Sequence, residues 1–473
     1  MSVGVQEERA EVRLDEHGIE PIPVADRDST PLQQFWIWCG ANIAPINWVL
    51  GALGIVLGLS LLETTIVVLI GNLVGCSIFG LFCIMGHRTG VNQMVLSRSA
   101  FGRRGAYVPA AAQMLMTMAW LGVNTWVVLD LVLGILGHLG YHGGIGTKYA
   151  IGIGIMAVQV VIAIVGFYAI RSFEKYTVPL TAAIMLVMSV LAWSKTDIVW
   201  TQSAAVGGAK FTAITQLLTA IGVGWGLTWL TWSSDYTRFV RPDIAERKVF
   251  LGGMLGIFIP TVWLAFLGAS IASGGTNADP AALVSEVFGV MAIPVLFVVM
   301  HGPVATNILN LYSASLAALS LGINAARWKV SALVALIGTG FLIAFIQSES
   351  FAHAFDNFLA SVVLWISAWG GVALVEFYAL RGGRVNVEGL YEPPERSPYG
   401  DINWLALGAL ALGLIAGWAW EYGLVSFMQG PIAIRFGNSD FSWLTAFIVS
   451  GTVFYIGSRS SRRPAIGEAR AGT

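Results

Sequence analysis

The sequence predicts an all-α membrane protein with twelve transmembrane helices. Its 473 residues are 56% hydrophobic and only 11% charged, and the mean hydropathy is +0.73. A soluble globular protein carries about 25% charged residues, and a chain with so few charges cannot cover a folded surface in water. A second observation is the repeated occurrence of apolar stretches long enough to cross a bilayer.

These apolar stretches occur twelve times. A helix needs about 20 apolar residues to cross about 30 Å of hydrocarbon. The approximate limits are 33–59, 63–85, 107–138, 149–171, 175–195, 212–234, 248–273, 291–322, 328–347, 353–380, 401–422 and 440–458. The predicted organisation is a tail at 1–32, a ten-helix core at 33–380, a Pro- and Gly-containing loop at 381–400, two peripheral helices at 401–458 and a tail at 459–473.

The distribution of positive charge predicts the orientation of these helices. With the N-terminus inside, the outward loops hold four of the 26 Lys and Arg residues, which are Lys148, Lys195, Lys210 and Arg435. Positively charged loops stay on the cytoplasmic side. We therefore predict a multi-pass protein of the plasma (inner) membrane with both termini in the cytoplasm. The polar, acidic N-terminal 30 residues lack the regions of a cleaved signal peptide.

The charge balance excludes nucleic acid as a partner. A net charge of -1 and a pI of about 6.6 leave no basic face for a phosphate backbone. The expected partners are the lipid bilayer and a small molecule, and the sequence carries no signal for an oligomeric state. Cys39, Cys76 and Cys83 lie within apolar runs, which favours a packing role. Glycines at 71 and 75, and at 222 and 226, have the spacing that lets helix backbones approach closely.

Two predicted helices contain residues that disfavour a continuous helix. Helix 1 has Pro45 within 40–48, where the missing backbone donor frees carbonyls that a cation can use. Helix 6 alternates glycines with large side chains over 222–229. Each feature alone could be a simple kink. Their positions five helices apart favour a transporter site between two inverted repeats, because irregular backbone at this depth must be buried or line a cavity.

Helix 3 carries a polar face inside the membrane. Gln113, Trp120 and Asn124 recur at multiples of three to four residues and can share one side of a helix. Trp120 could stack on a flat ring while the Asn124 amide, which has one acceptor and one donor group, reads the edge of a nucleobase. Packing is the alternative for Trp120 taken alone.

Helix 8 carries a second polar stripe, formed by Thr306, Asn307, Asn310 and Ser313. Thr306 could offer a hydroxyl oxygen to Na⁺, and Asn310 could face the substrate. The alternative is that these side chains only bond neighbouring helices. Asp130 of helix 3 is a candidate proton carrier.

Three motifs resemble the nucleobase and cation symporter family, type 1, in its purine and cytosine permease branch. They are Trp120-Leu-Gly-Val-Asn124 in helix 3, Ser234-Asp-Tyr-Thr-Arg238 at the end of helix 6 and Thr306-Asn-Ile-Leu-Asn-Leu-Tyr-Ser313 in helix 8. The resemblance runs from about 30 to 460. It implies the leucine-transporter fold, with inverted repeats at about 33–195 and 212–380 followed by two peripheral helices.

The resemblance also implies roles for individual residues. Trp120 would stack on the heterocycle, Asn124 and Asn310 would bond it, and Trp229 or else Trp225 would close its other face. Thr228 would contribute to the choice among rings. A sodium ion would lie between helix 1 carbonyls, here those of Ala41 and Ala44, and helix 8 hydroxyls. This chain has Ala305-Thr306 where sodium-coupled members have two hydroxyl residues, and related fungal permeases without that pair use protons.

The expected function is therefore import of cytosine or a purine by cation-coupled alternating access, with Na⁺ or H⁺ as the coupling ion and no other cofactor. A pyrimidine or pyridine vitamin precursor and a hydantoin-like ring are the rival substrates. A membrane enzyme is disfavoured because the sequence lacks His-Glu-x-x-His, Gly-x-Ser-x-Gly and aspartate-rich motifs. A channel or receptor is disfavoured because two helix breaks indicate an occluded site.

Overall fold

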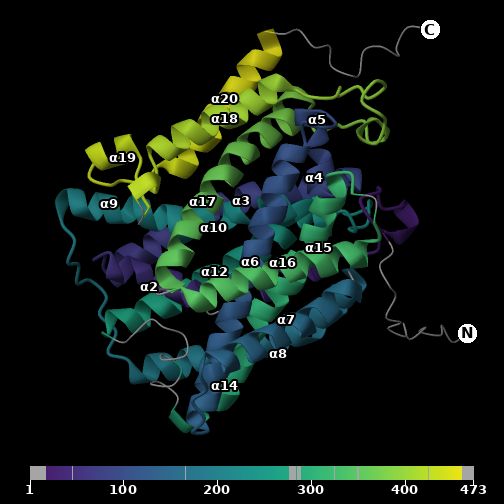
Figure 1. Ribbon diagram of the computed structural model, residues 1–473. Helices are drawn as coiled ribbons and strands as arrows, with labels where there is room; N and C mark the ends of the chain where they lie inside the picture. Colours follow the sequence, from purple (N-terminus) through teal and green to yellow (C-terminus); the bar gives the residue numbers. More distant parts are fainter. Residues whose placement is uncertain are drawn as a thin grey trace, which may run out of the picture.

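The computed structural model is a helical bundle, as the sequence predicts (Figure 1). It describes residues 17–44, 46–165, 167–275, 284, 289–323, 325–348, 351–423 and 426–460. Apart from one isolated bridge between Ser29 and Val240, the regular secondary structure of these residues is helical. The predicted all-α class is confirmed for these residues.

Each of the twelve predicted stretches coincides with one helix or with a short series of helices. In chain order these are α1 (Pro31–Asn42) with α2 (Ile46–Val56), α3 (Leu61–Thr89), α6 (Tyr107–His138), α7 (Ile145–Val165), α8 (Phe167–Lys195), α9 (Gly207–Leu217) with α10 (Val223–Thr228) and α11 (Ser233–Thr237), α12 (Glu246–Ser273), α14 (Ala292–Val299) with α15 (His301–Ser320), α16 (Arg327–Gln347), α17 (Phe351–Leu374), α18 (Trp404–Ala419) and α20 (Ser442–Ser460). The short helices α4 (Gln93–Leu96), α5 (Arg98–Phe101) and α19 (Pro431–Arg435) lie between them.

Most of these helices are long and apolar enough to cross a membrane. Among the described residues, nine helices meet that condition, and the bent pair of α1 and α2 makes a tenth span. The helix α18 is apolar but only 16 residues long, which is shorter than the usual span of about 20 residues. Membrane crossing by α18 and α20 therefore stays a prediction.

The predicted boundary between the fourth and fifth helices is wrong. The predicted limits 149–171 and 175–195 leave 172–174 between the two helices, but α7 ends at Val165 and α8 begins at Phe167. Arg171 and Glu174 consequently lie inside α8. Charges spaced three residues apart fit one side of a helix, and Arg171 reaches Asp28 of the N-terminal segment in an ion pair of 2.5 Å. The two charged residues therefore belong to the first turns of α8 and not to the connection before it.

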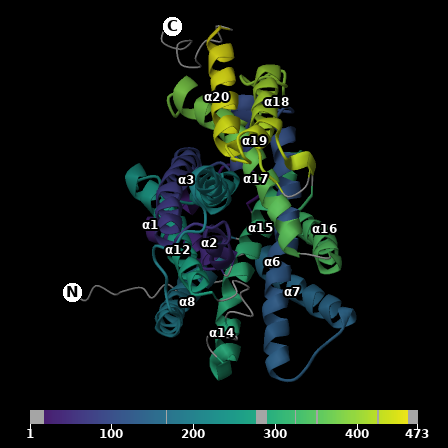
Figure 2. The same cartoon turned by 90° about the vertical axis from the view of Figure 1, so that its left-hand side faces the viewer.

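The helices form two groups with the last two helices at one edge. Figure 2 shows α1, α2, α3 and α12 on one side of the bundle and α6, α7 and α16 on the other. Contacts link α12 to α1, α2 and α3, and link α6 to α15 and α16. The helices α18 and α20 pack on each other and on α17 (Figure 1), so they stand outside the ten-helix core.

The N-terminal segment from 17 to 30 packs on one end of the bundle. Its backbone meets α3 where Ile22 N donates to Gly90 O at 2.9 Å, and it meets the end of α11 through the Ser29–Val240 bridge. Tyr391 of the loop at 381–403 donates its hydroxyl to Ile19 O at 2.6 Å. This segment therefore ties the loop and two helix ends together.

Glycines let α3 and α10 approach with their backbones in contact, as their spacing predicts. A methyl group built on Gly71 would lie 2.7 Å from the Cα of Gly222, and one built on Gly226 would overlap the backbone of Gly75. These two contacts hold α10 against α3 at a distance that larger side chains would prevent. They fix the position of the aromatic residues that α10 carries.

The glycine contact generates a test of stability. We expect Gly71→Ala to lower the free energy of unfolding by about 1–3 kcal/mol, because the new methyl group meets backbone atoms that cannot move aside. Thermal unfolding of the purified protein in detergent measures the effect. Gly154→Ala is the control, since no atom lies within 4 Å of a methyl group there. Equal stability of the two variants would contradict the close approach.

Candidate functional site

Helix 1 breaks where the sequence predicts. The helix α1 ends at Asn42, α2 begins at Ile46, and their axes differ by 60°. Pro45, the residue from which the break was predicted, lies outside the described residues. Elsewhere in the described chain, no other pair of consecutive spanning helices bends by more than 40°.

The break leaves carbonyl groups that need partners inside the bundle. The last four carbonyls of a helix have no partner within it, and in hydrocarbon each unpaired group costs several kcal/mol. Ala41 O accepts a hydrogen bond from Thr306 Oγ1 of α15 at 2.7 Å. Asn42 O accepts one from Asn47 Nδ2 of α2 at 2.6 Å. The broken ends of helix 1 are thus held to each other and to helix 8.

Helix 6 departs from regular α-geometry at places other than those predicted. The segment 222–229 was expected to be interrupted, but Val223–Thr228 is α-helical. A π-turn at Leu218–Gly222 precedes it and a 3₁₀ turn at Leu230–Trp232 follows it. The glycines serve close packing against α3, which keeps this backbone helical, and the irregular turns lie on both sides of the packed segment. Such π-turns occur often at functional sites.

One cavity lies where helices 1, 3, 6 and 8 meet. Its volume is only about 20 Å³. Its eleven lining residues are Ala41, Ala44, Ile46, Trp120, Asn124, Trp225, Thr228, Trp229, Trp232, Thr306 and Asn310. Nine of them are the residues that the sequence analysis selected. The cavity is thus closed around a space too small for a ring unless side chains move.

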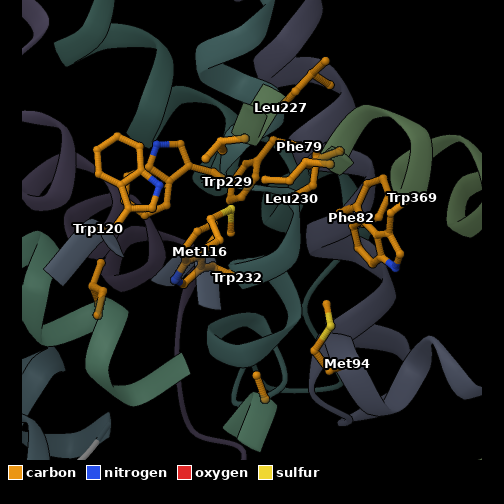
Figure 3. Close-up of a cluster of buried hydrophobic side chains, with 14 of the residues drawn as sticks. Phe79, Phe82, Met94, Met116, Trp120, Leu227, Trp229, Leu230, Trp232 and Trp369 are labelled. Carbon is orange, nitrogen blue, oxygen red and sulfur yellow. The ribbon is translucent and has the colours of Figure 1, made fainter. Parts of the chain in front are cut away.

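The walls of the cavity are aromatic. The ring of Trp225 stands perpendicular to that of Trp120, with centroids 6.3 Å apart and an interplanar angle of 87°. Trp229 instead packs edge to face on Trp38 and Trp232, at 5.7 Å and 5.4 Å. Figure 3 shows Trp120 of α6 beside Trp229 and Trp232. The ring of Phe358 lies closer to Trp120, with centroids 5.1 Å apart. Of the two candidate tryptophans, Trp225 is the one whose ring contacts Trp120, whereas the sequence analysis placed Trp229 first.

The cavity also holds polar groups that are free to bind a ligand. Asn124 Nδ2 donates to Trp120 O at 3.1 Å, and Asn310 Nδ2 donates weakly to Asn307 Oδ1 at 3.4 Å. The amide oxygens of Asn124 and Asn310 accept no hydrogen bond from the described part of the chain. Two acceptors from different helices thus border one aromatic cavity.

Trp232 is a cavity residue that the sequence analysis did not select. Its indole N–H, like that of Trp229, is buried and has no hydrogen-bond partner among the described residues. A buried indole N–H usually finds a partner, so both groups are candidate donors to a ligand. The Trp232 signal was present in the sequence, since it lies three residues after Trp229 and can share its face of a helix.

Asn307 has the packing role that we kept as the alternative for the helix 8 stripe. Its amide nitrogen lies within 3.0 Å of three acceptors, which are Leu121 O, Thr125 Oγ1 and Gln159 Oε1. These atoms belong to α6 and α7. Asn307 therefore joins three helices behind the cavity and does not line it.

Glu174 is a buried carboxyl group that sequence reasoning missed. The residue is 0% exposed, and neither of its carboxyl oxygens has a hydrogen-bond partner among the described residues. It lies against Gly40 of α1, where a methyl group would overlap the carboxyl. Residue 174 falls between the predicted limits 149–171 and 175–195, so Glu174 was not counted among the intramembrane polar groups. Correct placement of the helix boundary would have revealed it.

The family model for permeases of cytosine/purines, uracil, thiamine and allantoin matches residues 21–444 of this chain. The chain belongs to that family. The resemblance to the nucleobase and cation symporters, drawn from three motifs, is thereby confirmed. The protein is a membrane permease and not an enzyme.

Individual relatives agree with this assignment. The putative purine-cytosine permease YxlA of Bacillus subtilis is 24% identical over 455 residues, which cover 94% of this chain and 96% of the relative. The purine-cytosine permease fcyB of Emericella nidulans is 24% identical over 464 residues, which cover 94% and 88%. A solved structure of Mhp1 is also similar, with a TM-score of 0.76 and 20% identity. Mhp1 is a nucleobase-cation-symport-1 family transporter, in a closed conformation with bromovinylhydantoin bound. The match covers 94% of this chain and 95% of the Mhp1 chain. This likeness shows that the permease has the Mhp1 fold.

The contacts of Asn307 generate a second test. We expect Asn307→Ala to lower the free energy of unfolding by about 1–3 kcal/mol, because buried groups on α6 and α7 lose their partner. The measurement is thermal unfolding in detergent. Asn403→Ala, which loses a single bond to Ala100 O, should lose less. A smaller loss for Asn307→Ala than for Asn403→Ala would refute the bridging role.

Proposed function

We propose that this permease imports cytosine or a purine across the plasma (inner) membrane by cation-coupled alternating access, with both termini in the cytoplasm. The observation that carries the proposal is the closed cavity in which Trp120 and Trp225 meet two amide oxygens. A flat heterocycle offers two faces to stack on and an edge with donors and acceptors. The names of the relatives YxlA and fcyB agree with this class of substrate.

Stacking and edge recognition divide between different residues. Trp120 covers one face of the ring, and Trp225 turns from its perpendicular position to cover the other, because the closed cavity leaves no room for a ring between them. The amide oxygens of Asn124 and Asn310 accept hydrogen bonds from ring or exocyclic N–H groups. Trp229 and Thr228 complete the wall on the α10 side.

The cation site that we propose lies at the helix 1 break. Sodium prefers oxygen ligands, and the Thr306 hydroxyl lies 2.7 Å from Ala41 O and 3.0 Å from Gly302 O. Ala44 O, which accepts a hydrogen bond from Asn47 N at 3.1 Å, would complete a neutral set of carbonyls and one hydroxyl suited to a small monovalent cation. In the structure the Thr306 hydroxyl donates a hydrogen bond to Ala41 O at this position. A bound cation would replace that hydrogen bond.

Proton coupling is the second candidate. Ala305 provides no hydroxyl next to Thr306, and Glu174 places a buried carboxyl without a described partner against α1 next to the break. An isolated carboxylate in hydrocarbon is costly unless it binds a proton or a cation. Asp130, the carrier considered from the sequence, lies on α6 and is partly exposed. The structure therefore offers a more deeply buried carboxyl than the one first considered.

The stacking role predicts the behaviour of Trp120→Ala. Cells or proteoliposomes with the wild-type protein should accumulate radiolabelled cytosine in a saturable manner. The variant should lose at least about fivefold of that uptake, because stacking on an aromatic ring contributes about 1–3 kcal/mol. Trp404→Ala, which removes an exposed Trp of α18, is the control and should keep uptake.

Unlabelled rings identify the substrate in the same assay. Adenine or hypoxanthine should compete with cytosine for the wild-type protein. Competition by hydroxymethylpyrimidine or hydantoin alone would assign the site to the rival rings. Normal uptake by Trp120→Ala with normal membrane expression would remove the stacking role.

The cation site predicts a separate effect for Thr306→Ala. If Na⁺ binds at the break, loss of the hydroxyl should raise the Na⁺ concentration for half-maximal uptake by about tenfold, which corresponds to roughly 1.4 kcal/mol of binding. Thr339→Ala, whose hydroxyl bonds only within α16, should not change it. Wild-type uptake that ignores Na⁺ but follows a pH gradient would reject Na⁺ and support proton coupling.

A further inference from the structure

We infer that Asn42 is a positioning residue that couples the cation site to the aromatic wall of the substrate cavity. The inference rests on the proposed function, because it concerns how the two proposed sites communicate. Asn42 does not line the cavity, and it is the last residue of α1 before the helix 1 break. Its hydrogen bonds place it between the two sites.

The side chain of Asn42 bonds two other helices, α10 and α12, and the preceding turn of its own helix α1. The residue is 0% exposed, and its Oδ1 accepts a hydrogen bond from Trp225 Nε1 at 2.8 Å. The same oxygen lies 3.5 Å from Thr261 Oγ1 of α12, and Nδ2 donates to Trp38 O at 2.8 Å. These bonds fix the orientation of the amide, so Asn42 holds the Trp225 indole in its present position.

The backbone on either side of Asn42 belongs to the proposed cation site. Ala41 O is the carbonyl that meets Thr306, and Asn42 O is held by Asn47 from the other side of the break. Adjacent residues of one helical turn cannot move independently. A change at the Ala41 carbonyl therefore displaces the Asn42 amide and, through it, the ring of Trp225.

Through this connection, a bound cation would favour one orientation of the Trp225 ring relative to Trp120 over other orientations. A cation that draws the carbonyls of Ala41 and Ala44 together would fix the last turn of α1 and so fix Asn42. Trp225 would then be held in one orientation relative to Trp120, which lowers the cost of binding a ring between them. Coupling of this kind requires that each ligand favours the same arrangement, and the Asn42–Trp225 bond supplies the shared element.

The experiment compares the affinity for cytosine with and without the cation. Equilibrium binding of radiolabelled cytosine to the purified protein is measured in Na⁺, in choline and at two pH values. We expect the wild-type protein to bind more tightly in the presence of its coupling cation. Asn42→Ala should lower that ratio of affinities by about two- to tenfold, the effect expected from one hydrogen bond.

Variants on both sides of the bond keep the test decisive. Trp225→Phe removes the N–H donor and should lower the ratio as Asn42→Ala does, and it carries the test if Asn42→Ala does not fold. The double variant should be no worse than either single variant, because both remove the same bond. Asn403→Ala, a buried asparagine with a single bond to Ala100 O, should keep the wild-type ratio.

The outcomes separate this inference from the proposed function. A full wild-type ratio in both Asn42→Ala and Trp225→Phe overturns the inference and leaves the proposed function intact. A purely structural role for Asn42 would lower thermal stability without changing the ratio, and that result also overturns it. A wild-type protein whose cytosine affinity responds to neither Na⁺ nor pH overturns cation coupling, and the inference with it.

Discussion

The arrangement of the site depends on the need to satisfy backbone carbonyls inside a membrane. A helix that breaks in hydrocarbon exposes groups that only the protein can bond. Here the break between α1 and α2 is accommodated because Thr306 and Asn47 bond the carbonyls of Ala41 and Asn42. The same bonds bring helix 8 to helix 1 and leave a cavity beside them. Without these partners the break would be too costly, and the cavity would not form.

Close packing of glycines supplies the opposite wall. Gly75 and Gly226 let α10 lie directly on α3, and this fixes where Trp225 and Trp229 project. The cavity that results is closed, with Trp225 perpendicular to Trp120. A ring can be bound only if these side chains move, which is the behaviour expected of a site that is reached from one side of the membrane at a time.

Much of the site could be predicted because its signals are local. Trp120 and Asn124 share a helix face by simple periodicity, and the break in helix 1 follows from Pro45 in the sequence. The remainder depends on tertiary contacts. The irregular turns of helix 6 lie beside the glycines because packing on α3 keeps the glycine segment helical. Glu174 was missed because it fell between the predicted limits of two helices. The bond from Trp225 to Asn42 joins residues 183 positions apart.

The central claim is that Trp120 and Trp225 enclose the substrate ring. An experimental structure of the protein with bound cytosine tests it directly. The account predicts density for the ring between the two indoles, with their planes turned from 87° toward parallel and with the amides of Asn124 and Asn310 at its edge. Cytosine bound elsewhere, or indoles that stay perpendicular around a bound ring, would contradict the account.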